Sequence, residues 1–160
     1  MHSEIKLKLL MSRFFILASI SLVSVALSFI VIPIFQIHVH VYQTGIFMIG
    51  FLFGPLYGAL AGAVISSYNA LFVLHNPWVI GGNALLGLSA AFLYKRMRPL
   101  EAVLAAYALQ LPYLFVTDVY FAGMPISAVG LVSIALLASN LLSGMVAWKI
   151  TNAIANEIKR

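Results

Sequence analysis

The stretch GFLFGPLYGALAG, residues Gly50–Gly62, places a helix break and a series of evenly spaced glycines between two apolar segments. Gly54 and Pro55 are expected to end one helix and begin the next, because a proline lacks the backbone N–H that a helix interior needs. Gly54, Gly58 and Gly62 recur every four residues, a spacing that lets two helices approach closely within lipid. The stretch therefore predicts two helices joined by a tight turn. The second helix would use its glycine face for packing inside the bundle or for docking a partner subunit.

The composition around this stretch is that of a membrane protein. Of the 160 residues, 63% are hydrophobic and 8% are charged, and the mean hydropathy is +1.07. A water-soluble globule needs more charged surface than this. Apolar runs of about twenty residues suit membrane helices, whereas the strands of a membrane barrel alternate over about ten. We therefore predict an all-α integral membrane protein.

Six apolar segments predict a single membrane domain, residues 1–160, in the form of a six-transmembrane-helix bundle. The expected spans are 9–35, 41–53, 55–74, 78–94, 100–121 and 127–150. The second span is short, because about 13 residues at ~1.5 Å each cover roughly 20 Å of a ~30 Å hydrocarbon core.

The basic residues predict the orientation of this bundle. All nine lysines and arginines fall in the N-terminal segment, in the loop between the fourth and fifth spans, or towards the C-terminus. With six spans these three regions share one side of the membrane, so the positive-inside rule makes both termini cytoplasmic. The net charge of +5 is thus explained by topology, and we expect no binding of nucleic acid.

Polar side chains gather in the outer half of the predicted bundle. The stretch QIHVHVYQ, residues 36–43, alternates polar and apolar side chains between the first two spans, and Gln110, Tyr113, Thr117 and Tyr120 recur on one face of the fifth. Polar groups inside a bilayer usually face a bundle interior or a water-filled cavity, so this pattern predicts a cup open to the outside. The candidate ligand-binding residues are His38, His40, Tyr42, Tyr68, Asn83, Gln110, Tyr113, Thr117 and Asp118.

Several of these elements have simpler interpretations. Trp78 and Tyr120 are typical of aromatic anchors at a membrane edge. Asn83 or Asn140 alone is typical of a hydrogen bond between neighbouring helices, and His75 in a wet loop is typical of a solvated side chain.

Four motifs together carry a family resemblance: FIVIPIF at 29–35, GFLFGPLYGALAG at 50–62, NALLG at 83–87 and YKRMRP at 94–99. With them the chain resembles the substrate-binding S components of energy-coupling factor (ECF) vitamin transporters, above all the riboflavin-type members. The resemblance implies a six-helix protein of a prokaryotic plasma membrane that captures a water-soluble vitamin from outside. It also implies a transmembrane T component and two cytoplasmic ATPase subunits as partners, with no cofactor in this chain.

The resemblance further implies roles for particular residues. The first external loop, with His38, His40 and Tyr42, would form part of a lid over the ligand. The outer halves of the later helices would supply contacts from Asn83, Tyr113, Thr117 and Asp118. Family members dock to the T component through small residues in the first helix; here Ala18 is followed four residues later by Leu22, and Ser21 supplies another small position. We therefore expect docking through Ala18 and Ser21, with the face of Gly54, Gly58 and Gly62 as a second candidate.

The side chains of the predicted cup limit the class of ligand that it could bind. Its loops and outer helix ends hold no lysine or arginine, and a carboxylate or phosphate ligand would need a cationic partner once desolvated. Tyrosine, histidine and amide groups suit a flat heteroaromatic ring such as a riboflavin-, thiamin- or deazapurine-like compound. Asp118 favours a neutral or cationic molecule.

Two other functions fit the sequence. The first is a nickel- or cobalt-type S component, with His38, His40, His75 and Asp118 as potential ligands. The second is a membrane scaffold of the rod-shape-determining type, which has a similar size and span count and binds proteins. The sequence lacks paired carboxylates and nucleophile–base motifs, so we do not expect an enzyme.

Overall fold

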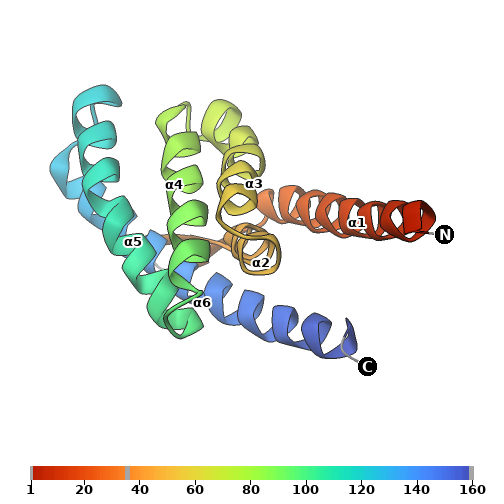
Figure 1. The fold of residues 1–160 in the computed structure, drawn as a ribbon. Coiled ribbons are helices and arrows are strands. Elements are labelled where there is room, and N and C mark those ends of the chain that lie inside the picture. Colours follow the sequence, from red (N-terminus) through yellow and green to blue (C-terminus); the bar gives the residue numbers. More distant parts are fainter. Residues whose placement is uncertain (1, 35–36, 159–160) are drawn as a thin grey trace.

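The computed structural model describes residues 2–34 and 37–158, with the side chains of residues 11, 13–30 and 39–154. Within these residues the chain forms six α-helices and one two-stranded hairpin (Figure 1). The elements are α1 (His2–Ser28), β1 (Val31–Ile34), β2 (Ile37–His40), α2 (Gln43–Phe53), α3 (Pro55–Tyr68), α4 (Trp78–Leu93), α5 (Pro99–Val116) and α6 (Ile126–Ile158). Two short π-helices, η1 (Asn69–Val73) and η2 (Thr117–Phe121), prolong α3 and α5. The predicted all-α membrane fold is confirmed, and the hairpin is an addition to it.

The first predicted span, 9–35, is wrong at its outer end. The helix stops at Ser28, and Val31–Ile34 pairs antiparallel with Ile37–His40, with Val31 opposite His40 and Pro33 opposite His38. Val31, Ile32 and Ile34 are β-branched and favour a strand, while Pro33 cannot donate the hydrogen bond that a continuing helix needs. The other five predicted spans correspond to helices in the structure, although α6 continues past residue 150 to Ile158.

The short second helix lies in the centre of the molecule. Every residue from Gln43 to Gly50 is buried, so α2 packs inside the bundle rather than spanning a bilayer by itself. Gly54, with φ of 102°, ends it in a conformation that side-chain-bearing residues rarely adopt, and Pro55 begins α3 directly afterwards. The Gly-Pro turn predicted from the sequence is therefore present.

The glycines of α3 bring its backbone against α4. A Cβ atom on Gly58 would overlap the backbone of Gly87, and one on Gly62 would overlap the backbone of Asn83. The four-residue glycine spacing thus serves close packing within the chain, the first of the two uses that the sequence allowed.

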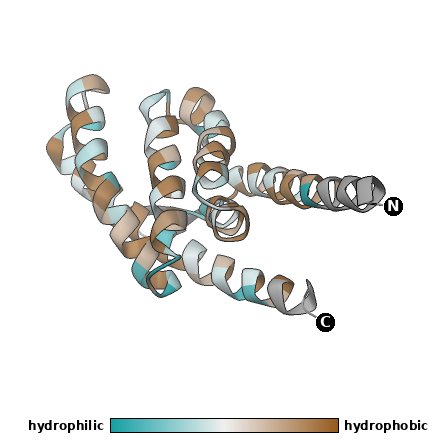
Figure 2. Ribbon diagram, viewed as in Figure 1, coloured by the Kyte–Doolittle hydropathy of each residue, from teal (hydrophilic) through white to brown (hydrophobic). Residues whose placement is uncertain are grey.

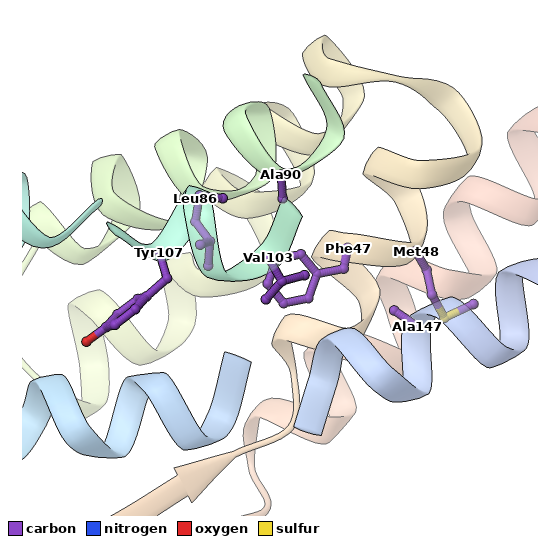
Figure 3. Close-up of a cluster of buried hydrophobic side chains, with 8 residues drawn as sticks. Phe47, Met48, Leu86, Ala90, Val103, Tyr107 and Ala147 are labelled. Carbon is purple, nitrogen blue, oxygen red and sulfur yellow. The ribbon is translucent and has the colours of Figure 1, made fainter. Parts of the chain in front are cut away.

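The main hydrophobic core joins α2, α4, α5 and α6. Phe47 and Met48 of α2 meet Leu86 and Ala90 of α4 and Val103 of α5 in one buried cluster, which Figure 3 shows. Ala106 and Tyr107 of α5 and Ala147 of α6 complete it. This core lies towards the ends of α4 and α5 that the α4–α5 loop connects.

The outer surface is apolar, as a lipid environment requires. Large side chains such as Phe14, Leu22, Val64 and Phe72 are more than half exposed, and Figure 2 shows hydrophobic positions along all of the helices. Among the described residues three helices, Pro55–Val73, Pro99–Phe121 and Ile126–Ile154, are long and apolar enough to cross a membrane. The chain is a membrane protein. In Figure 1, α1 and the C-terminal part of α6 extend away from α4 and α5.

Two connections at one end of the bundle share a backbone conformation. The first connection, residues 69–77, runs from η1 to α4, and the second, residues 117–125, runs from η2 to α6. In each, the π-helix is followed by a residue near φ −90°, by a residue with positive φ, and by a proline before the next helix. The N–H groups of Asn76 and Met124 then return to the carbonyls of Ala70 and Asp118, both at 2.8 Å.

Candidate ligand-binding cavity

A cavity of about 250 Å³ lies between α4, α5, α6 and the hairpin, at the end of the molecule that holds the two connections. The α4–α5 loop lies at the other end of the same helices (Figure 1). Polar side chains from five elements, and from the turn before α2, line the cavity: His40, Tyr42, Asn69, Asn83, Gln110, Tyr113, Thr117 and Asp118. Leu131, Val132, Ala135 and Leu136 give α6 an apolar wall.

One side of the cavity forms where α4 has no side chains. A Cβ atom on Gly81 would overlap the hydroxyl of Tyr113, and one on Gly82 would lie 3.3 Å from Nε2 of Gln110. The two glycines therefore let α5 side chains reach over α4, and the Tyr113 hydroxyl donates a hydrogen bond to the carbonyl of Trp78 at 3.1 Å. Gln110 is only 3% exposed, and its oxygen Oε1 has no hydrogen-bond partner among the described residues. Gln110 thus brings to the cavity wall an amide oxygen with unused hydrogen-bonding capacity.

The hairpin covers the cavity from the side of α6 and α4. The backbone N–H of His40 donates to Oγ of Ser139 on α6 at 3.0 Å. The Tyr42 hydroxyl lies 3.5 Å from Nδ2 of Asn83 on α4, and the rings of His40 and Tyr42 are 5.7 Å apart. The polar edge of QIHVHVYQ, as far as the structure describes it, thus faces the cavity.

The two connections touch each other beside the cavity. Nδ2 of Asn76 in the first connection donates to Oδ1 of Asp118 in the second at 2.7 Å, and the rings of Trp78 and Phe121 lie 4.9 Å apart. Both contacts join the start of α4 to η2, so they close this side of the cavity. Asp118 is 5% exposed.

The structure brings together seven of the nine residues that the sequence singled out: His40, Tyr42, Asn83, Gln110, Tyr113, Thr117 and Asp118. Tyr68 does not line the cavity, because its ring packs on Phe29 and Phe72 with centroids 4.5 and 5.7 Å away. The side chain of His38 lies outside the described residues. Tyr120 is 73% exposed, since the π-helix has more residues per turn than an α-helix and rotates it off the stripe of Gln110.

Several lining residues were not foreseen as ligand contacts. Asn69, next to Tyr68 in sequence, points inward, and its Nδ2 donates to the carbonyl of Ser28 at 3.3 Å. Trp78, interpreted as a membrane anchor, lines the cavity as well. Its place beside Gly81 and Gly82 was the available signal, since glycines on a helix facing aromatic residues leave room for a ligand. The apolar residues of α6 carried no signal that separates them from core residues.

Among the described residues, the lining of the cavity contains no lysine or arginine. Among the described residues no group of three or more His, Cys, Asp or Glu lies close enough to hold a metal ion, and His75 is not part of the lining. The amide, hydroxyl and aromatic groups of the described lining suit recognition by hydrogen bonding and ring contact.

The predicted docking positions divide into two groups. Gly58 and Gly62 are buried against α4, which leaves them unavailable to a partner subunit. Gly54 is partly exposed at the turn before α3. Ala18 is exposed and Ser21 is partly exposed on α1, so docking through α1 stays a prediction.

The fold and cavity together define a helical membrane protein with a ligand-sized site near one end of its bundle. No protein-family model matches the chain, and no curated protein matches it. Among solved structures it is similar to one described as the S component of a bacterial ECF transporter, with a TM-score of 0.58 and 21% sequence identity. The match covers 93% of this chain and 98% of that chain. At this identity the likeness shows the fold, which is that of an ECF S component along almost its whole length.

Proposed function

We propose that this chain is the substrate-binding S component of an ECF-type importer, which captures a small heteroaromatic vitamin or vitamin precursor from outside the cell. The observation that carries the proposal is the cavity with the unpartnered, buried Oε1 of Gln110. A buried acceptor without a partner costs about 1–3 kcal/mol, and a ligand N–H in the cavity would remove that cost. The shared fold supports the S-component assignment.

The size and lining of the cavity support a small ring as ligand. Trp78 and Tyr113 offer aromatic faces, and Asn83 and Gln110 offer amide groups. A volume of about 250 Å³ lies just below the ~300–1,000 Å³ typical of ligand pockets. It favours a thiamin- or deazapurine-like compound over one as large as riboflavin. The lack of lysine and arginine in the described lining disfavours acidic vitamins such as folate, biotin or pantothenate.

The positions of the charges support uptake from outside through a multi-pass protein of the plasma membrane. Lys95, Arg96 and Arg98 are exposed in the α4–α5 loop, at the end of α4 and α5 opposite the cavity. By the positive-inside rule this loop is cytoplasmic and the cavity opens outward, with the hairpin as its lid. A scaffold protein would need no such cavity.

Energy coupling would come from partner subunits, since the sequence contains no nucleotide-binding loop. A transmembrane T component would dock along α1, where Ala18 is exposed and the large side chains Phe14 and Leu22 are more than two thirds exposed. An apolar groove of about 500 Å³ between α1, α2 and α6 lies beside this surface. Proteoliposomes with the chain alone should bind ligand without accumulating it, and accumulation should require the T component, both ATPases and ATP.

Ligand binding by the purified chain tests the proposal. Native mass spectrometry of gently purified protein should detect a co-purified small molecule, and calorimetry with riboflavin, thiamin and a deazapurine should find a binder. Gln110→Ala should weaken binding about tenfold, the value of roughly one hydrogen bond. Leu109→Ala is the matched control, because Leu109 is the neighbour of Gln110 in sequence but lies on the exposed face of α5. A chain that binds no vitamin and instead retains wall-synthesis proteins would support the scaffold alternative.

A further inference from the structure

Asp118 is a buried acid whose charge nothing in the described lining neutralises. It is 5% exposed, and its carboxylate accepts a hydrogen bond from the neutral amide of Asn76 at 2.7 Å. The ion pair found among the described residues, between Arg98 and Glu101, lies at the other end of the helices. A single amide donor leaves most of the desolvation cost of a carboxylate in place, so a cation in the cavity would stabilise the ionised form of this acid.

The fold itself does not require an acid at this position. Ala70 occupies the equivalent place in the first connection, and its carbonyl accepts the returning N–H at the same 2.8 Å distance as that of Asp118. The first connection, with alanine at this place, thus forms the same kind of turn as the second, between a π-helix and a proline. The difference is in what the two side chains face: Ala70 is enclosed by protein, whereas Asp118 faces the cavity.

The other described groups around the cavity provide no fixed positive charge. Within the described lining the remaining titratable side chains are Tyr42, Tyr113 and His40, and of these only the imidazole can become cationic. Trp78 and Tyr113 also line the cavity, and an aromatic ring face in contact with a ligand favours a cation over an anion, because the face carries partial negative charge.

From this placement we propose that the ligand of the cavity is an organic cation, a nitrogen heterocycle of about thiamin size whose positive charge lies against Asp118. The inference rests on the proposed function and narrows it from neutral or cationic ring compounds to cationic ones. Asp118 sets the charge preference, while Gln110 and Asn83 bind the polar edge of the ring.

Matched ligand pairs and an isosteric variant test the inference. The probes are thiamin, which carries a quaternary ring nitrogen, and its neutral deaza analogue, in which carbon replaces that nitrogen. Riboflavin, a neutral deazapurine and biotin complete the panel, and any co-purified molecule is identified by its mass. The variant is Asp118→Asn, which keeps an oxygen to accept from Asn76. Glu101→Gln is the control, because it removes the same charge from an exposed position far from the cavity.

We expect the cation to bind at least tenfold more tightly than its neutral analogue, and Asp118→Asn to reduce this ratio to below about threefold. Glu101→Gln should leave the ratio unchanged. His40→Gln tests whether the imidazole sets the preference for charge, and in this variant thiamin should still bind more tightly than its neutral analogue. Tighter binding of a neutral or acidic compound, with the same affinity in Asp118→Asn, would overturn the inference while the proposed function stands. A protein that binds no panel member and co-purifies with none would overturn the proposed function itself.

Discussion

The first connection, residues 69–77, and the second, residues 117–125, have the same backbone and different side-chain chemistry. Leu74 and Ala122 end the π-helices with φ of −92° and −90°, and each returns its N–H to the carbonyl five residues before, at 2.8 Å. His75 and Gly123 follow with φ of 50° and 67°. At the second position of the π-helix, however, the first connection has Ala70 and the second has Asp118.

This comparison separates what the turn needs from what the cavity uses. The turn needs a wide helical end, one residue with positive φ and a proline before the next helix, and both connections meet those requirements. The acid at 118 and the amide at 76 are additional, and they bond to each other across the two connections. When two segments share a backbone conformation and differ in their side chains, the polar side chains that the conformation does not require are the better guide to function.

The largest effect should follow from copying the acid into the other connection. Ala70 is fully buried and is not among the residues that line the cavity, so Ala70→Asp would place a carboxylate in a position closed to solvent. We expect a loss of stability of about 3 kcal/mol or more, or no folded protein. Thermal unfolding in nanodiscs measures this. Ala70→Ser is the control: Ser66 and Ser67 show that hydroxyls on α3 bond to a carbonyl of their own helix, so its cost should be below about 1 kcal/mol. Equal tolerance of both variants would refute the distinction between the two positions.

The next effect concerns the bond that joins the two connections. Asn76→Ala removes the donor to Asp118 and the acceptor of the Trp78 N–H. Because one partner is a buried carboxylate, we expect a loss of about 2 kcal/mol in unfolding free energy. In an Asp118→Leu background the loss should be clearly smaller, since the acceptor is absent there. Strictly additive losses in the double variant would contradict a direct interaction.

Sequence analysis predicted the helices where local chemistry sets their ends. Gly54 and Pro55 separate α2 from α3, Pro77 and Pro125 directly precede α4 and α6, and Pro99 is the first residue of α5. Five spans could therefore be predicted from the positions of glycine and proline and from hydropathy. The end of α1 could not, because residues 29–35 are as apolar as a membrane helix. Val31–Ile34 is a strand only because it pairs with Ile37–His40, and hydropathy does not reveal that pairing.

Helical periodicity predicted the site residues on α5 correctly as far as that helix keeps regular α-helical geometry. Gln110, Tyr113 and Thr117 line the cavity as the stripe predicted, and the stripe fails at Tyr120 because η2 begins at Thr117. Choosing Tyr68 over Asn69 was an error of one residue, which on a helix is about 100° of rotation. No sequence pattern distinguishes such neighbours on a helix whose lipid-facing and inward-facing sides are both largely apolar.

A smaller effect is expected at the positive-φ position of the second connection. Gly123 has open space around the place of a Cβ atom, so Gly123→Ala tests backbone conformation without a steric clash. We expect a loss of about 1 kcal/mol, the cost of a left-handed conformation for a residue with a side chain. Gly130→Ala is the matched control, because Gly130 also has open space but lies inside α6, where alanine should stabilise by up to about 1 kcal/mol. Losses of equal size at both sites would show that packing, not φ, determines the result.

The smallest effect is expected at the equivalent position of the first connection, where a histidine adopts the conformation that glycine adopts in the second. His75 has φ of 50°, is exposed and does not line the cavity. His75→Gly should therefore leave ligand affinity unchanged and raise the unfolding free energy by up to about 1 kcal/mol, because the relief of strain exceeds the added freedom of the unfolded chain. Asparagine tolerates positive φ better than most residues, so the unfolding free energy of His75→Asn should lie between those of the unchanged protein and His75→Gly. Thermal unfolding measures the effect on stability, and calorimetry on the same samples measures the effect on ligand affinity. If His75→Gly weakened ligand binding, the strain at this residue would serve the site, and the first connection would take part in recognition as well as the second.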